Sequence, residues 1–446
     1  MRRSRAPLGI LAFALIALAA WPAFVTRMNA DAAPASVVSN FTPAPVTRDY
    51  LVRDNLVAFY ERAVRRTPDD QIMARMLAGQ YLMRFRERGD VGDLKRARIA
   101  ASRSLVLQPR HNDGAESELG SVALSLHNFR AAKAYYEDVT RMAPWNHDGW
   151  ANLASADMEL GEYTAAREVL AKSQGPNVDA AWETSLARYD ELTGDLKGAQ
   201  AHLTIGMQQI DSVIDNPAEA RAWYHFRAGE LAFENGDADM TVRDLRDALT
   251  IFPDDARALN TLARVYCATH RWHEALEAAE KAAELVPLPE TLGYEVDARR
   301  ALGDKAGADE TQDLIFAIQR IGNANGINDR AIAVFESEHG IRLDDAVRIA
   351  RRDLASRDDL YAEDTLAWAL AMDGRFAEAR SHAARAVAVG TRDSRVLFHA
   401  GWISYRLGDK AKARLLLQSA LAANPQFHPY YADWARAALH GLAMSR

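Results

Sequence analysis

A spacing of 34 residues recurs along this 446-residue chain and constrains its fold more than any other feature. A turn residue is followed twelve positions later by a small or branched residue, and five positions beyond that by proline. This holds for Gly236, Ala248 and Pro253, for His270, Ala282 and Pro287, for Gly408, Ala420 and Pro425, and for His127, Val139 and Pro144. One compact core rarely exceeds about 250–300 residues. Because the period is regular, we expect a repeat array rather than unrelated domains.

Each unit is expected to be an antiparallel pair of helices. Alanine is abundant and runs of β-branched residues are rare, which favours helix throughout. Glycine tolerates the left-handed turn after the first helix, and proline stops the second helix because it lacks an N–H. Aspartate pairs stand where helices begin and are expected to cap them. These pairs are Asp69-Asp70, Asp254-Asp255, Asp344-Asp345 and Asp358-Asp359.

The pattern is similar to that of the tetratricopeptide repeat (TPR) family. In one unit the family's positions hold Leu259, Leu262, Ala263, Tyr266, Ala275, Ala279, Ala282 and Pro287. In the last unit they hold Leu397, Ala400, Gly401, Ser404, Ala413, Leu417, Ala420 and Pro425. The chain therefore resembles a bacterial-type exported or membrane-anchored TPR scaffold. The resemblance implies an all-α, right-handed superhelical solenoid of about ten antiparallel helix pairs. We place the units at about 71–109, 113–146, 147–179, 180–213, 222–255, 256–288, 289–321, 327–359, 360–393 and 394–427.

One segment is expected to divide the array. The unit at 289–321 lacks the closing proline, and the sequence IGNANGIN that follows holds two glycines, which predicts a break or hinge. We therefore expect a first part over residues 50–321, starting with an extra N-terminal helix, and a second part over residues 322–446. The segment YYADWARAAL is expected to cap the C-terminal end, since a terminal repeat otherwise exposes an apolar face.

The N-terminus has the composition of an export signal. Three arginines precede an apolar stretch over residues 8–25, and Ala30 and Ala32 form an A-x-A cleavage site. That stretch is also near the minimum length that spans a bilayer, so residues 1–32 are predicted to be a cleaved signal peptide or a retained inner-membrane anchor. Either one predicts an extracytoplasmic protein, periplasmic or secreted, because the arginines stay inside. Residues 33–49 are expected to be a flexible linker.

Charge, cysteine content and motifs argue against several functional classes. The formal net charge of -7 leaves no excess of cations for nucleic acid or an anionic membrane surface. The single cysteine, Cys267, excludes an intramolecular disulfide and a cysteine-rich zinc module. P-loops, dinucleotide fingerprints, nucleophile elbows and H-E-x-x-H motifs are absent from the sequence. We therefore expect a non-catalytic protein without cofactor or metal.

The concave face is the expected binding surface. By resemblance to the family, the second, fifth, ninth, twelfth and thirteenth places of each unit point there. Aromatic and arginine side chains at these places, chiefly in the second half, resemble a protein-binding hot spot, although some rings are expected to pack between helices instead. A protein or peptide partner is expected to contact Trp223, Phe226, Phe233, Asn260, Arg264, Tyr361, Trp368, Arg395, Phe398, Trp402, Tyr405 and Arg406.

Two alternative functions stay open at this point. Cys267, His270 and His273 are metal-ligand types at intervals of three, which would suit a metal-binding or enzymatic accessory protein. Structural zinc sites use four ligands, however, and this spacing does not place the three side chains on one helical face. The other alternative is a structural component of the cell envelope that self-associates through its end faces.

Overall fold

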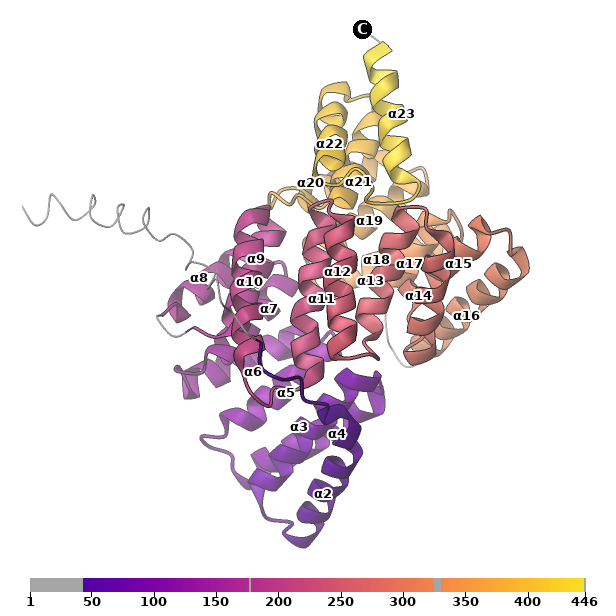
Figure 1. The fold of residues 1–446 in the computed structure, drawn as a ribbon. Coiled ribbons are helices and arrows are strands. Elements are labelled where there is room, and N and C mark those ends of the chain that lie inside the picture. Colours follow the sequence, from indigo (N-terminus) through magenta and orange to yellow (C-terminus); the bar gives the residue numbers. More distant parts are fainter. Residues whose placement is uncertain (1–42, 176–177, 325–329, 445–446) are drawn as a thin grey trace, which may run out of the picture. The chain divides into compact units, whose positions relative to one another are not determined.

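The fold described by the computed structural model is entirely helical. The structure describes residues 43–175, 178–324 and 330–444, and within them the chain forms 22 α-helices and no β-strand (Figure 1). The predicted all-α helical repeat fold is confirmed. The predicted signal or anchor (residues 1–32), most of the predicted linker and part of the predicted break lie outside the described residues. None of the described helices is both long and apolar enough to cross a membrane.

The helices form ten hairpins, flanked by extra helices at both ends. The first helices are α3 (Gln71–Arg88), α5 (Asp113–Ser125), α7 (His147–Glu159), α9 (Ala180–Thr193), α11 (Ala218–Glu234), α13 (Ala256–Ala268), α15 (Pro289–Ala301), α17 (Arg330–Glu338), α19 (Leu360–Met372) and α21 (Ser394–Arg406). The second helices are α4 (Val91–Leu107), α6 (Phe129–Met142), α8 (Tyr163–Ser173), α10 (Leu196–Ser212), α12 (Ala238–Ile251), α14 (Trp272–Leu285), α16 (Lys305–Ala324), α18 (Leu343–Ser356), α20 (Phe376–Ala386) and α22 (Lys410–Ala423). The 3-10 helix η1 (Asp49–Val52) and α2 (Arg53–Arg66) precede them, and α23 (Tyr431–Met444) follows.

Side-chain caps and left-handed turns set the helix boundaries. Asp255 accepts hydrogen bonds from the backbone N–H groups of Arg257 and Ala258 at 3.0 and 3.4 Å, so α13 begins with an aspartate cap. Inside the hairpins, the turn residue is left-handed whether it is Gly236 (φ 78°) or His270 (φ 58°). The repeating position identified in the sequence is therefore the residue that reverses the chain.

The prediction that Asp344 and Asp345 cap a helix is wrong. The cap of α18 is Arg342, which is left-handed with a φ of 48°, and both aspartates lie inside the first turn. Their negative charge still suits the N-terminal end of the helix dipole. The carboxylate of Asp345 also accepts a hydrogen bond from the side chain of Arg342 at 2.6 Å. It therefore stabilises the turn before the helix and does not cap the free N–H groups of the first helical turn.

Small side chains let the helices of the array pack closely. Ala263, Ala275 and Ala279 are fully buried between α13 and α14. Each second helix packs against its own first helix, and all of them except α16 also pack against the helix that follows; most first helices contact one another directly. The first helices therefore form a continuous inner layer, which positions the candidate site described below.

Three glycine turns bring distant parts of the array into backbone contact. A Cβ on Gly161 would lie 1.9 Å from the carbonyl oxygen of Asp358, and one on Gly194 would lie 2.2 Å from that of Gly390. A Cβ on Gly236 would lie 2.9 Å from the carbonyl oxygen of Ala423. We call these three contacts the seam.

Hydrogen bonds reinforce the seam across nearly two hundred residues of sequence. The backbone N–H of Leu360 donates to the hydroxyl of Tyr163 at 2.9 Å. The amide of Asn424 donates to the carbonyl oxygen of Phe233 at 2.6 Å. The turns of the third, fourth and fifth hairpins thus meet the segments that follow the eighth, ninth and tenth, and the array closes on itself.

The seam predicts unequal effects of two glycine substitutions. Gly194 and Gly408 are both left-handed, with φ of 90° and 81°, but nothing lies within 4 Å of a Cβ on Gly408. An alanine at either position should lower the free energy of unfolding by about 1–2 kcal/mol, because a Cβ disfavours the left-handed backbone conformation. Gly194→Ala should cost roughly 1–3 kcal/mol more, since it drives a methyl group into the opposing backbone. Urea unfolding of both variants measures the difference; equal losses would mean that the seam is open in solution.

Candidate functional site

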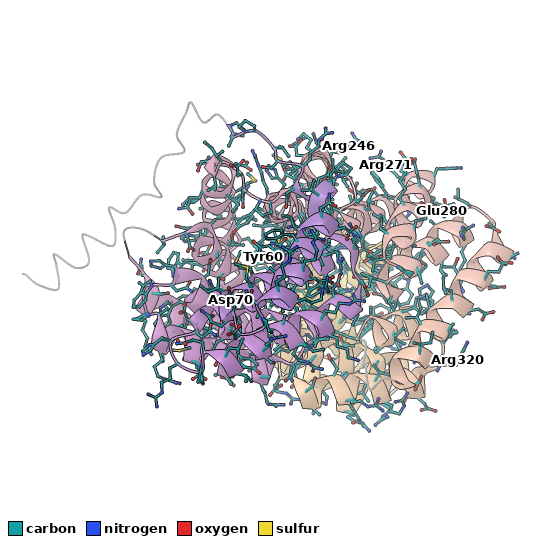
Figure 2. All side chains as sticks on the ribbon, turned by 90° about the horizontal axis from the view of Figure 1, so that it is seen from below. Tyr60, Asp70, Arg246, Arg271, Glu280 and Arg320 are labelled. Atoms are coloured by element: carbon teal, nitrogen blue, oxygen red, sulfur yellow. The ribbon has the colours of Figure 1, made fainter. Side chains whose placement is uncertain are left out.

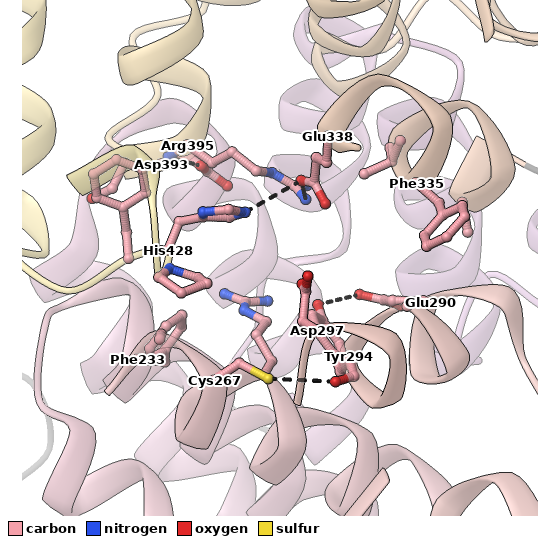
Figure 3. Close-up of a pocket in the computed structure, with 18 of the residues that line it drawn as sticks. Phe233, Cys267, Glu290, Tyr294, Asp297, Phe335, Glu338, Asp393, Arg395 and His428 are labelled. Carbon is pink, nitrogen blue, oxygen red and sulfur yellow. Dashed lines mark hydrogen bonds and ion pairs between the residues drawn. The ribbon is translucent and has the colours of Figure 1, made fainter. Parts of the chain in front are cut away.

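A cavity of about 300 Å³ lies among the first helices of the array (Figure 3). Its lining residues come from α11, α13, α15, α17 and α21, together with the loop between α22 and α23. Among the described residues, no second helix contributes to the lining. The cavity therefore belongs to the inner face, where the family resemblance places the binding surface.

Aromatic rings form the apolar part of the cavity wall. Phe233, Phe335 and Phe427 are all buried and all line it. Phe427 is carried by the loop after α22, and its ring lies 5.7 Å from that of Phe398 in the core. Asn424 joins the same loop to α11 across the seam. Closure of the array therefore helps to build the cavity.

One histidine in the cavity carries an ion-pair partner. The Nδ1 of His339 lies 2.8 Å from the carbonyl oxygen of Phe335, and its Nε2 lies 3.2 Å from Oδ1 of Asp297. Burial by itself would lower the pKa of His339. The hydrogen bond to Asp297 and the charge of that carboxylate outweigh burial and raise the pKa above its usual value. Because both ring nitrogens lie within hydrogen-bond distance of an oxygen, the site favours the doubly protonated ring.

A second histidine is held in its neutral form. The Nδ1 of His428 accepts from the backbone N–H groups of Tyr430 and Tyr431 at 3.2 and 3.3 Å, so it cannot carry a proton. Burial, and then the charge of Arg395, lower the pKa of His428 well below its usual value. The side chains of His428, Arg395 and Glu338 point toward one another (Figure 3). Burial raises the pKa of Glu338, although Arg395 opposes this.

Cys267 is buried in the cavity wall, and its two histidine neighbours in the sequence are exposed. Its sulfur lies 3.7 Å from the carbonyl oxygen of Tyr294, and burial raises the pKa of its thiol well above the usual value. A protonated thiol is a poor nucleophile and a poor metal ligand. His270 and His273 lie on the exposed surface. The part of the chain that the structure describes holds no group of three or more side chains suited to a metal ion.

The structure separates the predicted partner-binding residues into three groups. Three of them line the cavity: Phe233, Arg264 and Arg395. Three are buried in the core and are covered by neighbouring helices: Phe226, Trp368 and Phe398. The others lie elsewhere: Trp223, Asn260, Tyr361, Trp402, Tyr405 and Arg406.

Residues of that last group have partners of their own. Asn260 accepts a hydrogen bond from the hydroxyl of Thr291 at 2.9 Å. The rings of Trp402 and Tyr405 lie against each other at a tilt, and Trp402 also lies against Trp434 of α23. The guanidinium of Arg406 lies over the ring of Phe376. The aromatic residues near the C-terminus are thus part of the packing between the last hairpin and its cap.

The cavity residues that were not predicted come mainly from the two irregular units. Glu290 and Asp297 occupy the second and ninth places of the unit at 289–321. Phe335, Glu338 and His339 occupy the ninth, twelfth and thirteenth places of the unit at 327–359. The same family positions, applied to these units as well, identify all five residues. His428 lies in a loop outside any unit, and no repeat position points to it.

Sequence comparison identifies the repeats directly. Tetratricopeptide repeat family models match residues 123–189, 256–285 and 365–426. The chain therefore contains tetratricopeptide repeats in these three stretches. No curated protein matches it.

Solved structures that resemble the chain are distant in sequence. The human IFIT1 dimer with PPP-AAAA is 13% identical, with a TM-score of 0.50, and the match covers 76% of this chain and 78% of that one. Yeast Tom70 is 13% identical over 89% of this chain and 94% of its own, with a TM-score of 0.35. The type IV pilus biogenesis factor PilW is 18% identical over 46% and 92%, with a TM-score of 0.38. Of these, the likeness to IFIT1 supports the fold alone.

The lowered pKa of His428 predicts a specific dependence of stability on pH. The unfolded chain protonates this ring near its usual pKa of 6.5, whereas the folded chain resists protonation. The unfolded state then binds more protons, so His428 makes the free energy of unfolding fall as the pH drops below 6.5. His428→Asn removes this titration, and asparagine can still accept from the same N–H groups.

Urea unfolding between about pH 7.5 and about pH 5 measures the effect. As the pH falls over this range, the free energy of unfolding of wild type should decrease relative to that of His428→Asn. The exposed His270→Asn variant is the matched control, because asparagine tolerates the left-handed turn at that position. A constant difference between wild type and His428→Asn would contradict the neutral assignment.

Proposed function

We propose that this protein is a non-catalytic interaction scaffold that works outside the cytoplasm and binds a partner protein or peptide on its inner face. TPR repeats generally support a role in protein interaction. The observation that carries the proposal is the cavity among five first helices, because it combines buried rings with charged side chains on the inner face. Pockets of this kind, apolar with a few placed polar groups, are the usual form of a specific binding site.

The seam constrains how a partner enters. Because the third to fifth hairpins contact the segments after the eighth to tenth, an extended chain cannot lie along a fully open groove. The volume of about 300 Å³ admits one or two side chains and no more. The partner therefore inserts a short protruding segment, and the surrounding inner face contacts the remainder.

Charge favours a protein partner over a nucleic acid. The human IFIT1 dimer was solved with PPP-AAAA. Here the net charge is -7, and Glu290, Asp297 and Glu338 all line the cavity. A ligand with several phosphates would meet these carboxylates, whereas a peptide carries both signs of charge.

Site-specific photo-crosslinking tests the partner surface. Val334 lines the cavity, whereas Arg246 lies exposed on α12 at the periphery of the molecule (Figure 2). A photoreactive residue at position 334 should attach to a partner when the full-length protein is irradiated in its native cells. The same residue at position 246 is the control. Crosslinking at 246 alone, or at neither position, would contradict binding at the inner face.

A reporter fusion tests the location. Residues 1–49 fused to alkaline phosphatase, which folds only where disulfides form, should give an active enzyme. The same fusion to residues 33–49 alone should be inactive, because it lacks the basic and apolar stretches. The mass of the mature chain then distinguishes cleavage after Ala32 from a retained anchor. Export by this segment would be contradicted if the two fusions were equally active, or if both were inactive.

A further inference from the structure

Most arginines on the inner helices are neutralised by carboxylates. Arg330, which lines the cavity, donates to Asp353 at 2.6 Å and to Asp359 at 3.0 Å. The same holds further along the inner layer, where Arg188 and Arg227 both pair with Glu191 at 2.5 Å. Such pairing is expected, because an unpaired buried charge is costly and is best matched by an opposite charge.

Two arginines in the cavity depart from this rule. Among the described residues, Arg264 has no carboxylate partner and makes no side-chain hydrogen bond; its guanidinium lies 4.5 Å from the centre of the Phe233 ring. Within the described ranges, the one carboxylate that lies within ion-pair distance of Arg395 is Glu338, at 3.9 Å, which is beyond hydrogen-bond distance, and the Arg395 side chain is 36% exposed. Their charges repel each other across the same cavity. Burial opposes both charges, but Tyr294, Glu230 and Glu234 around Arg264, and Asp393 and Glu338 around Arg395, raise the pKa of both guanidiniums. Among the described residues, neither guanidinium donates a hydrogen bond to any of these groups.

We propose that Arg264 and Arg395 together bind a carboxylate group, and that an acidic side chain of an inserted partner peptide supplies it. This inference rests on the proposed function and specifies the chemistry of its cavity. A guanidinium presents a planar fork of N–H donors that matches the two oxygens of a carboxylate. The guanidinium of Arg264 lies over the ring of Phe233, and its N–H groups donate to no acceptor among the described residues, so they are free to bind a ligand.

The surrounding charges favour a single negative charge. Glu338 lies near Arg395, and Asp393 and Asp297 line the same cavity. A phosphate, which carries nearly two charges at neutral pH, would meet more repulsion there than a carboxylate. Phe335 and Phe427 line the remaining wall, so an apolar side chain beside the acidic one has a place to pack. The matching ligand is therefore a short peptide with one acidic and one apolar residue side by side.

Isothermal titration of the purified full-length protein tests this. The probes are a blocked tetrapeptide with one glutamate next to one phenylalanine, the same peptide with glutamine in place of glutamate, glutarate, and inorganic phosphate. We expect the glutamate peptide to bind at least about tenfold more tightly than the glutamine peptide, which corresponds to about 1.4 kcal/mol. Arg264→Gln and Arg395→Gln should each weaken the binding of the glutamate peptide by at least about tenfold. Arg246→Gln is the matched control and should leave it unchanged.

The outcomes separate the two levels of the proposal. If glutarate binds and the glutamate peptide does not, the ligand is not a peptide. If phosphate is the only probe that binds, the proposal of a carboxylate ligand is overturned. If no probe binds while the crosslink from position 334 persists, the carboxylate inference fails and the proposed function stands. If that crosslink is also absent, the proposed function fails with it.

Folding of the variants is checked independently. In the described part of the chain, Arg264 makes no ion pair and Arg395 makes only a long one with Glu338, so both glutamine variants should stay folded with melting temperatures close to that of wild type. Should either fail to fold, the arginine Nε–H signals of the wild-type protein provide a second measurement by NMR. Two of these signals should shift with the glutamate peptide and not with the glutamine peptide. Unchanged signals would overturn the proposal.

Discussion

Close approach of backbone to backbone at the seam is the constraint on which the rest of the structure depends. Gly161, Gly194 and Gly236 each place a turn against a carbonyl group from the far end of the array. Repeat proteins normally rely on contacts between neighbouring units alone. Here the seam adds contacts between units five apart in sequence, so the inner face is enclosed. The cavity follows from this closure, because the segment from Asn424 to Pro429 lines it and is joined to α11 by the seam.

Enclosure explains why the inner layer is so rich in ion pairs. Glu191 is buried, which by itself would raise its pKa, but Arg188 and Arg227 outweigh burial and lower it. For nearby Glu234, burial and the charge of Glu191 outweigh Arg188 and Arg264 and raise its pKa well above the usual value. The pKa values of these two buried carboxyls are thus shifted in opposite directions, as expected for two acids that interact in a water-poor interior. Against this background of paired charges, Arg264 and Arg395 are exceptional.

The sequence predicted the helical hairpins well. It did not predict that the array closes through contacts between distant hairpins. The 34-residue spacing located the left-handed turn at Gly236 and at His270 alike, because that turn is a local property of the backbone. Closure depends on a small rotation from each hairpin to the next, summed over several units, and no local pattern encodes that sum. The burial of Trp368 and Phe398 was missed for a related reason: their rings face the first helices of adjacent units and α23, and a single unit does not show which neighbour covers them.

Closure also changes which residues a partner can reach. In an open array, an aromatic residue on any first helix is a candidate contact, and the regular units are the natural place to look. In this closed array, the irregular units α15–α16 and α17–α18 supply much of the cavity wall, including Asp297 and Glu338. Departure from the consensus is informative here, because side chains that face a cavity are not required to fill the space between helices. Arg264 and Arg395, which donate no hydrogen bond to a carboxylate among the described residues, lie on α13 and α21, on either side of these units in sequence, and closure makes them part of one cavity.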